Sequence, residues 1–353
     1  MAHRPRPPAL HELDICETVA SASWHWNSLT GSLLHKASGM RVSPCNGICC
    51  DGREYRLSAD DIEIEDSPLG TGASGTVWKG IIKSTGTPVA LKTLKVEKSE
   101  DRSCLLNEVR GLVEAEGCPF LVQWHAGFVS KSTGHVHLVL ELMDFGSLSD
   151  LKSCTCSVPP RILARIASQV LRGLHHLHSR RLLHNDIKPG NVLLSRAGEV
   201  KISDFGITKS MDHSVSNACV GTQIYLAPEK CDYYGYSSPA DIWSFGMVLF
   251  ELATGRHPFS DARCFASIFN KLFKEPEPRL SEADGHPGPL CDFVARCLTR
   301  DQAERADAEE LLAHEFVADG EVASPHEMQE WLAMHPAPNS HGRCAVGGTE
   351  EVQ

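Results

Sequence analysis

No stretch of the sequence is apolar for long enough to cross a membrane. The longest apolar run, around Met247–Ala253, is far shorter than the roughly 20 residues that a membrane-spanning helix needs. The basic, proline-rich start, Met1–Pro8, is not followed by an apolar segment, so we expect no secretory signal. These absences favour a cytoplasmic protein, with the nucleus as an alternative location.

A surplus of positive charge is also missing. Lys and Arg number 34 against 45 Asp and Glu, which gives a formal net charge of −11. Because nucleic acids and anionic membranes bind to basic faces, we expect neither as a partner. Zinc-ligand spacing is absent near Cys45, Cys49 and Cys50, since no second Cys or His pair follows. Without an export signal, the 14 cysteines are expected to be reduced thiols.

The pattern of apolar residues divides the chain of 353 residues into regions of different character. Residues 1–60 are irregular, whereas Ile62–Leu142 favours short strands with one helix near Ser103–Glu116. Helical spacing follows, most clearly over Arg161–Arg180, and is lost beyond about residue 320. A small β-rich region before a larger helical one predicts an α+β fold.

A glycine-rich motif, Gly70-x-Gly72-x-x-Gly75-x-Val77, interrupts the strand-rich region. Dinucleotide-binding folds share this spacing, but there a helix begins at the third glycine. Here β-branched and aromatic residues follow, so we expect the motif to join two strands. Glycines in such a loop let backbone N–H groups approach phosphate oxygens. An ordinary glycine-rich turn remains the alternative for this motif alone.

A lysine and a glutamate occupy apolar surroundings next to that motif. Lys92 ends the apolar run Val89–Lys92, and burying its ammonium without a partner would be costly. Glu108 lies within the apolar stripe of the helix expected near Ser103–Glu116. We therefore predict that Lys92 and Glu108 pair. The alternative is a helix whose inner face borders solvent.

Polar residues cluster again in Leu183–Asn191 and in Asp204-Phe205-Gly206. Asn191 and Asp204 supply the amide and carboxylate oxygens that Mg²⁺ prefers. Asp186 precedes both and could accept a proton from a hydroxyl group.

These motifs, in this order and with Ala227-Pro-Glu229 after them, resemble those of the eukaryotic protein kinases over roughly residues 62–318. The resemblance implies a bilobal kinase fold, with a small β-rich N-lobe and a larger helical C-lobe. It divides the chain into an extension of residues 1–60, for which short strands and a docking tail are expected, a kinase domain of 61–318 and a loose tail of 319–353.

The resemblance also implies roles for individual residues. Asp186 would be the catalytic base, and Lys188 would neutralise the transferred phosphoryl group. Lys92, paired to Glu108, would hold the phosphates of ATP, and Asn191 with Asp204 would hold Mg²⁺. Glu229 would pair with Arg305. The remaining ATP contacts would come from Leu69, Gly70, Thr71, Gly72, Ala73, Ser74, Gly75, Val77 and Ala90, and from Glu141 and Met143 at the hinge.

Within the kinases, four segments are similar to those of the MAP kinase kinases. The resemblance implies dual-specificity phosphorylation of Thr and Tyr in a MAP kinase, downstream of a MAP kinase kinase kinase. A Ser/Thr kinase of another branch and an inactive pseudokinase scaffold remain alternatives, although the complete residue set argues against the scaffold. The segments are Gly72–Gly75, Met143–Leu148, Val220–Thr222 and Gly31–Gly39.

Two positions depart from the pattern of the family. Asn185 stands where the family has an arginine that anchors phosphate on the activation segment, and Ala218 stands at the second phosphosite. Ser214 matches the first phosphosite. We therefore expect activity not to depend on the usual double phosphorylation. The alternative is that Ser214 or Ser216 suffices with another cation.

The N-terminal segment loosely fits a docking motif for a MAP kinase. Arg4 and Arg6 are followed by Leu13 and Ile15, so basic residues precede spaced apolar ones. Short motifs of this kind also arise by chance, which is the alternative here.

Overall fold

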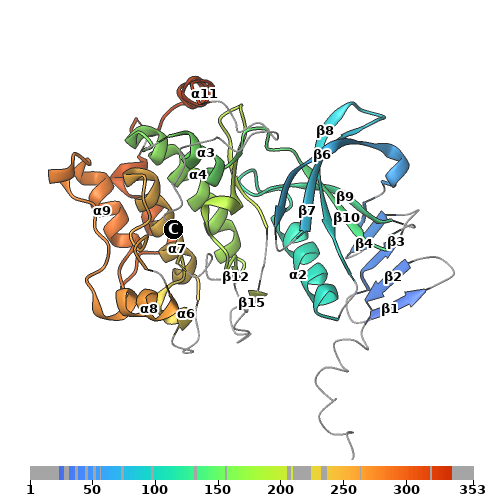
Figure 1. Cartoon of the computed structure of the whole chain (residues 1–353), viewed down its shortest axis with the longest axis horizontal. Helices are drawn as coiled ribbons and strands as arrows, with labels where there is room; N and C mark the ends of the chain where they lie inside the picture. Colours follow the sequence, from blue (N-terminus) through green and yellow to red (C-terminus); the bar gives the residue numbers. More distant parts are fainter. Residues whose placement is uncertain are drawn as a thin grey trace, which may run out of the picture. The chain divides into compact units, whose positions relative to one another are not determined.

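The computed structural model describes residues 24–27, 32–35, 39–43, 47–50, 53–55, 57–72, 75–96, 99–130, 133–155, 157–204, 208–209, 224–231, 237–262, 264–318 and 320–335. These residues form two compact units, one within residues 1–106 and 124–141 and the other within 107–123 and 142–353. Strands dominate the first unit and helices the second, as Figure 1 shows, which agrees with the expected bilobal kinase fold.

The first unit contains a five-stranded antiparallel sheet with the order β6-β7-β8-β10-β9. Its core includes Val89, Leu91, Phe128 and Val139, whose side chains are buried together. Strands β6 and β7 pair up to Gly72 opposite Gly75, so the expectation that the glycine motif joins two strands is confirmed. The strands are β6 (Ile62–Gly72), β7 (Gly75–Ile82), β8 (Thr87–Leu94), β9 (Trp124–Val129) and β10 (Val136–Glu141).

A second sheet of the first unit is built from the N-terminal extension. Its five short strands follow one another in the order β1-β2-β3-β4-β5, each antiparallel to the next. Strands β3, β4 and β5 contact β9, and buried Ile48 of β4 lies against Gly127 of β9. The strands are β1 (Trp24–Asn27), β2 (Ser32–His35), β3 (Arg41–Ser43), β4 (Gly47–Cys50) and β5 (Arg53–Tyr55).

Helices form most of the second unit, and two of them lie at its core. Helix α4 (Pro160–His178) buries the apolar stripe that the sequence predicts over Arg161–Arg180. Helix α7 (Pro239–Thr254) is buried over nearly its whole length. The other helices are α2 (Ser99–Ala115), which crosses the boundary between the units, α3 (Leu148–Cys154), α6 (Pro228–Cys231), α8 (Phe265–Lys274), α9 (Gly288–Cys297), α10 (Ala308–Leu312) and α11 (Pro325–Ala333).

Short strands and 3-10 turns connect these helices. They are β11 (Gly146–Ser147), β12 (Leu182–Leu183), β13 (Val192–Leu194), β14 (Val200–Ile202) and β15 (Thr208–Lys209), with η2 (Pro189–Asn191), η3 (Glu282–Asp284) and η4 (Glu315–Val317), whereas η1 (Ala59–Asp61) belongs to the first unit. Within the described ranges, no helix combines the length and the apolar character needed to span a bilayer.

The expectation of a loose tail from residue 319 is wrong for residues 320–335. Helix α11 begins after Ser324, whose hydroxyl accepts a hydrogen bond from the N–H of Glu327 while the Glu327 carboxylate accepts from the N–H of Ser324. Arg165 of α4 donates to the carbonyl of Ala323, and Met328 is fully buried. A helix of nine residues is too short to give clear periodicity, but the capping pattern was visible in the sequence.

Candidate active site

The loop between β12 and η2 contains the predicted catalytic residues of the second unit. His184 begins this loop and is fully buried. Its Nε2 donates to the carbonyl of Ser203 at 2.9 Å, and its Nδ1 accepts the N–H of Asp186 at 3.3 Å. Burial lowers the pKa of His184, which agrees with a neutral ring that has one donor and one acceptor nitrogen. His184 is therefore a rigid support for the backbone of Asp186.

The carboxylate of Asp241, near the start of α7, accepts hydrogen bonds from the backbone of the same loop. It accepts the N–H of His184 at 2.9 Å and the N–H of Asn185 at 2.8 Å. His178 of α4 lies 3.0 Å from the same carboxylate. Burial alone would raise the pKa of Asp241, but hydrogen bonding and charge from His178 hold it well below its ordinary value. The loop is thus anchored on an ionised carboxylate inside the unit.

Asp186 lies at the centre of a small polar network. The Lys188 ammonium lies 2.7 Å from Oδ2 of Asp186. The Asn191 amide nitrogen donates to the same Oδ2 and to the carbonyl oxygen of Asp186, both at 2.8 Å. Neither side-chain contact uses Oδ1, and about a third of the Asp186 side chain is exposed. The arrangement orients a carboxylate that can accept a proton from a hydroxyl group.

The pairing of β13 with β14 brings the two predicted metal ligands, Asn191 and Asp204, to the same end of a hairpin. Val192 pairs with Ile202, and the N–H of Ser203 donates to the carbonyl of Asn191 at 2.9 Å, so Asn191 and Asp204 flank the same end of this hairpin. The amide nitrogen of Asn191 donates to Asp186, so the amide oxygen is the atom of this side chain that could ligate a cation. The donor set fits Mg²⁺, which is typically held by one or two protein oxygens together with phosphates and water. In the described part of the chain there is no cluster of three or more His, Cys, Asp or Glu suited to a metal.

The nucleotide-binding residues predicted in the first unit lie on β6, β7 and β8. The Lys92 side chain is 1% exposed, and Lys92 lies in register between Val77 of β7 and Leu138 of β10. A Cβ on Gly75 would lie 2.2 Å from the carbonyl oxygen of Thr93, and the φ of Gly75 is +126°, so this position requires glycine.

The other predicted nucleotide contacts differ in exposure and are distributed over both units. Leu69, Gly70 and Thr71 of β6 are exposed, Val77 is half-buried and Ala90 is buried. Glu141 ends β10 in the first unit, whereas Met143 and Glu108 belong to the second. The predicted pairing of Lys92 with Glu108 joins the two units and stays a prediction. Ala73, Ser74, Ser214 and Ala218 lie outside the described residues, as do Arg4, Arg6, Leu13 and Ile15.

A buried ion pair braces the second unit, as the kinase resemblance implies. The Arg305 guanidinium donates to both carboxylate oxygens of Glu229, at 2.6 and 3.1 Å. The same guanidinium lies 5.1 Å from the ring centre of Trp243. This prediction is confirmed, and the bidentate geometry is the strong form of such a pair.

Two supporting residues, Asp241 and His178, were not predicted to act on the site. Asp241 stands more than 50 positions after the loop that it anchors. The tertiary packing of α7 brings its carboxylate to the loop that follows β12. One signal was present in the sequence, because a carboxylate inside the otherwise apolar segment of α7 needs buried partners.

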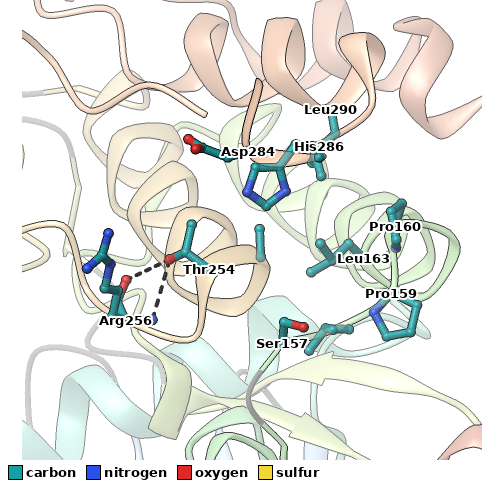
Figure 2. A pocket seen from close by; sticks show the side chains of 12 residues that line it. Ser157, Pro159, Pro160, Leu163, Thr254, Arg256, Asp284, His286 and Leu290 are labelled. Carbon is teal, nitrogen blue, oxygen red and sulfur yellow. Dashed lines mark hydrogen bonds between the residues drawn. The ribbon is translucent and has the colours of Figure 1, made fainter. Parts of the chain in front are cut away.

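A pocket of about 780 Å³ lies elsewhere in the second unit. It is lined by the start of α4, the end of α7 and the segment before α9, and Figure 2 shows Pro160 and Leu163 on the side opposite Arg256. Asp284 and His286 add polar groups. None of the predicted catalytic or nucleotide-binding residues lines this pocket, so it is separate from the site described above.

Comparison with known proteins agrees with the geometry. The protein kinase domain family matches residues 64–317. Mitogen-activated protein kinase kinase 3 of Arabidopsis thaliana is 36% identical over 270 residues, which cover 76% of this chain and 52% of the relative. Mitogen-activated protein kinase kinase 1 of the same plant is 35% identical over 272 residues, covering 75% and 76%. The human dual specificity mitogen-activated protein kinase kinase 7 is 30% identical over 274 residues, covering 75% and 65%. The chain thus spans about half the length of the first relative and three quarters of the second.

Proposed function

The chain belongs to the protein kinase family and, within it, to the mitogen-activated protein kinase kinases, and on this basis we propose that it phosphorylates Thr and Tyr in the activation loop of a MAP kinase. The network around Asp186, in which Lys188 and Asn191 contact one carboxylate oxygen, supports phosphoryl transfer, and the similarity to the MAP kinase kinases supports the choice of substrate. The phosphoryl donor is ATP, the substrate of this family. We further propose a cytoplasmic location and an upstream MAP kinase kinase kinase.

In the proposed reaction, the substrate hydroxyl attacks the γ-phosphorus of ATP. A bond forms between the hydroxyl oxygen and phosphorus, the bond to the β–γ bridging oxygen breaks, and ADP leaves. The carboxylate of Asp186 takes the hydroxyl proton, while the ammonium of Lys188 neutralises charge on the transferred group. Asn191 and Asp204 would hold Mg²⁺, which when bound would offset the negative charge of the phosphates. Lys92, which lies on β8 of the first unit, would bind the phosphates of ATP.

The test is phosphorylation of a panel of kinase-dead MAP kinases in vitro, with modified Thr and Tyr read separately by mass spectrometry. The wild-type chain should modify both residues in one or more members of the panel. Asp186→Asn removes the proton acceptor and should lower kcat by about 10² or more. Labelling of generic substrates alone would favour a Ser/Thr kinase of another branch. Turnover unaffected by Asp186→Asn would contradict the proposed base.

We also propose that the basic and apolar residues within positions 4–15 dock the MAP kinase substrate. Arg4 and Arg6 would contact acidic groups, and Leu13 and Ile15 would fill apolar pockets. Deletion of residues 2–15 should raise the KM for the MAP kinase and leave the KM for ATP unchanged. An unchanged KM for the protein substrate would remove this segment from the proposal.

A further inference from the structure

Lys230 makes a contact with the catalytic loop that the proposed reaction does not use. It lies on helix α6, which begins directly after Ala227. Its ammonium donates a hydrogen bond to the backbone carbonyl oxygen of Asn185 at 3.1 Å. Because Asn185 immediately precedes Asp186, this carbonyl belongs to the peptide group that leads into the proposed base.

The backbone of Asn185 is held on both sides. Its N–H donates to Asp241 at 2.8 Å, and its carbonyl accepts from Lys230. Its φ of +69° lies in the left-handed region, which costs free energy for a residue other than glycine and needs support from its surroundings. Since a peptide group is planar, holding the carbonyl oxygen also orients the N–H of Asp186 towards His184.

Three carboxylates lie near the buried Nζ of Lys230. Burial lowers the pKa of Lys230 below its ordinary value, and the carboxylates of Asp241, Glu229 and Asp186 offset only part of that effect. Glu229 is already paired with Arg305, and Asp241 contacts His178. What the geometry supports is the hydrogen bond itself, because Nζ of Lys230 lies within donating distance of the Asn185 carbonyl on the side of the loop next to α6.

We propose that Lys230 is a positioning residue for phosphoryl transfer, which holds the Asn185–Asp186 peptide group so that the Asp186 carboxylate meets the substrate hydroxyl. The inference rests on the proposed function, because it assigns Asp186 the role of base. It makes the placement of α6 a determinant of kcat, whereas nucleotide binding depends on other residues.

The experiment compares Lys230→Met, Lys230→Arg and the control Lys274→Met, which removes an exposed lysine from α8. Lys230→Met keeps the length of the side chain but removes the donor, and should lower kcat by roughly 10- to 100-fold, since small displacements of a reacting group have effects of that size. The KM for ATP should stay within about twofold. Lys230→Arg restores a charged donor and should recover most of kcat. The control should match the wild type.

Hydrogen exchange gives a readout that does not depend on turnover. In Lys230→Met, amides of residues 184–188 should exchange faster, while those in the middle of α7 should stay as protected as in the wild type. Lys230→Arg should return the loop amides towards wild-type protection. A merely structural loss of packing would instead raise exchange in α6 and α7 together and would not be rescued by arginine.

Two results would overturn the inference while leaving the proposed function intact. One is a Lys230→Met enzyme with wild-type kcat, and the other is equal loss of kcat and of α7 protection in both Lys230 variants. A wild-type chain that transfers phosphate to generic substrates but to no MAP kinase would instead refute the proposed function, and the Lys230 variants would then be compared on the generic substrate. Measuring the wild type first separates these cases.

Discussion

Among the described residues, three that are not glycine have a positive φ, and two of them belong to the candidate site. They are Asn185 at 69° and Asp204 at 58°. Asn and Asp are the residue types that best tolerate this region, because their short polar side chains can bond to nearby backbone groups. The identity of these residues is therefore explained partly by backbone conformation. At Asn185 a carboxylate and an ammonium support that conformation from two sides.

The buried side chain of His257 should make the stability of the protein depend on pH. His257 is 5% exposed, its Nδ1 accepts the N–H of Phe259 at 3.0 Å, and its ring meets the edge of Tyr225. Burial lowers the pKa of His257 to about 4. Because the unfolded chain binds this proton below its ordinary pKa of about 6.5 while the folded chain does not, stability falls as the pH drops from about 6.5 to about 4.

Acid unfolding of His257→Asn tests this expectation. At pH 5 the histidine should reduce the free energy of unfolding by about 2 kcal/mol relative to neutral pH. Asn retains an acceptor for Phe259 but does not titrate, so the variant should show a shallower loss between pH 6.5 and 4 in urea titrations. His326→Asn, at an exposed histidine, is the control and should leave the slope unchanged. Identical slopes in wild type and His257→Asn would contradict the prediction.

At the scale of secondary-structure elements, strand β4 stabilises the first unit by packing against β9. Gly127 leaves room for Ile48, because a Cβ there would lie 2.4 Å from the Cδ1 of Ile48 and 3.1 Å from the carbonyl of His137. The N-terminal sheet thus covers β9, which lies at the edge of the central sheet. The short strands of the N-terminal sheet would be only marginally stable without this contact.

This contact should be visible as coupling between two substitutions. Gly127→Ala should destabilise the wild-type chain by about 1–3 kcal/mol through overpacking. In an Ile48→Ala background the same change should cost less, because the clash with the Ile48 side chain is gone. Urea unfolding of the wild type, both single variants and the double variant measures the coupling. Strictly additive costs would show that the two residues do not pack together.

Helices and strands can be predicted from the sequence where the local pattern of apolar residues or glycines identifies them. They are harder to predict where tertiary contacts determine the structure. The apolar stripe of α4 and the glycine hairpin are local patterns, and both are present. The strands of residues 24–55 are only three or four residues long, so no alternation identifies them individually. In the site, the resemblance to the protein kinases singled out Asp186, Lys188 and Asn191, and the structure brings these three side chains into contact. The anchoring contacts of Asp241 depend on how α7 packs.

At the scale of the whole molecule, the two departures from the family bear on regulation. The resemblance to the family implies that Asn185 stands where the family has an arginine and that Ala218 stands at its second phosphosite. A neutral amide cannot form the charged fork that an arginine makes with a phosphate. Helix α6 contacts the catalytic loop through Lys230, whose Nζ donates to the carbonyl of Asn185.

Activity should therefore persist without phosphorylation of the activation segment. A charge-assisted bond is worth about 1.5–3 kcal/mol, so an enzyme switched by one would lose roughly 10- to 100-fold in kcat when the phosphate is removed. We expect phosphatase treatment, Ser214→Ala and Ser216→Ala each to change kcat by less than about twofold. Mass spectrometry should confirm that phosphate is absent from the treated protein. A loss of tenfold or more in any of these three arms would contradict the prediction, and a loss confined to one serine variant would show that this serine retains the switch with a cation other than the arginine that Asn185 replaces.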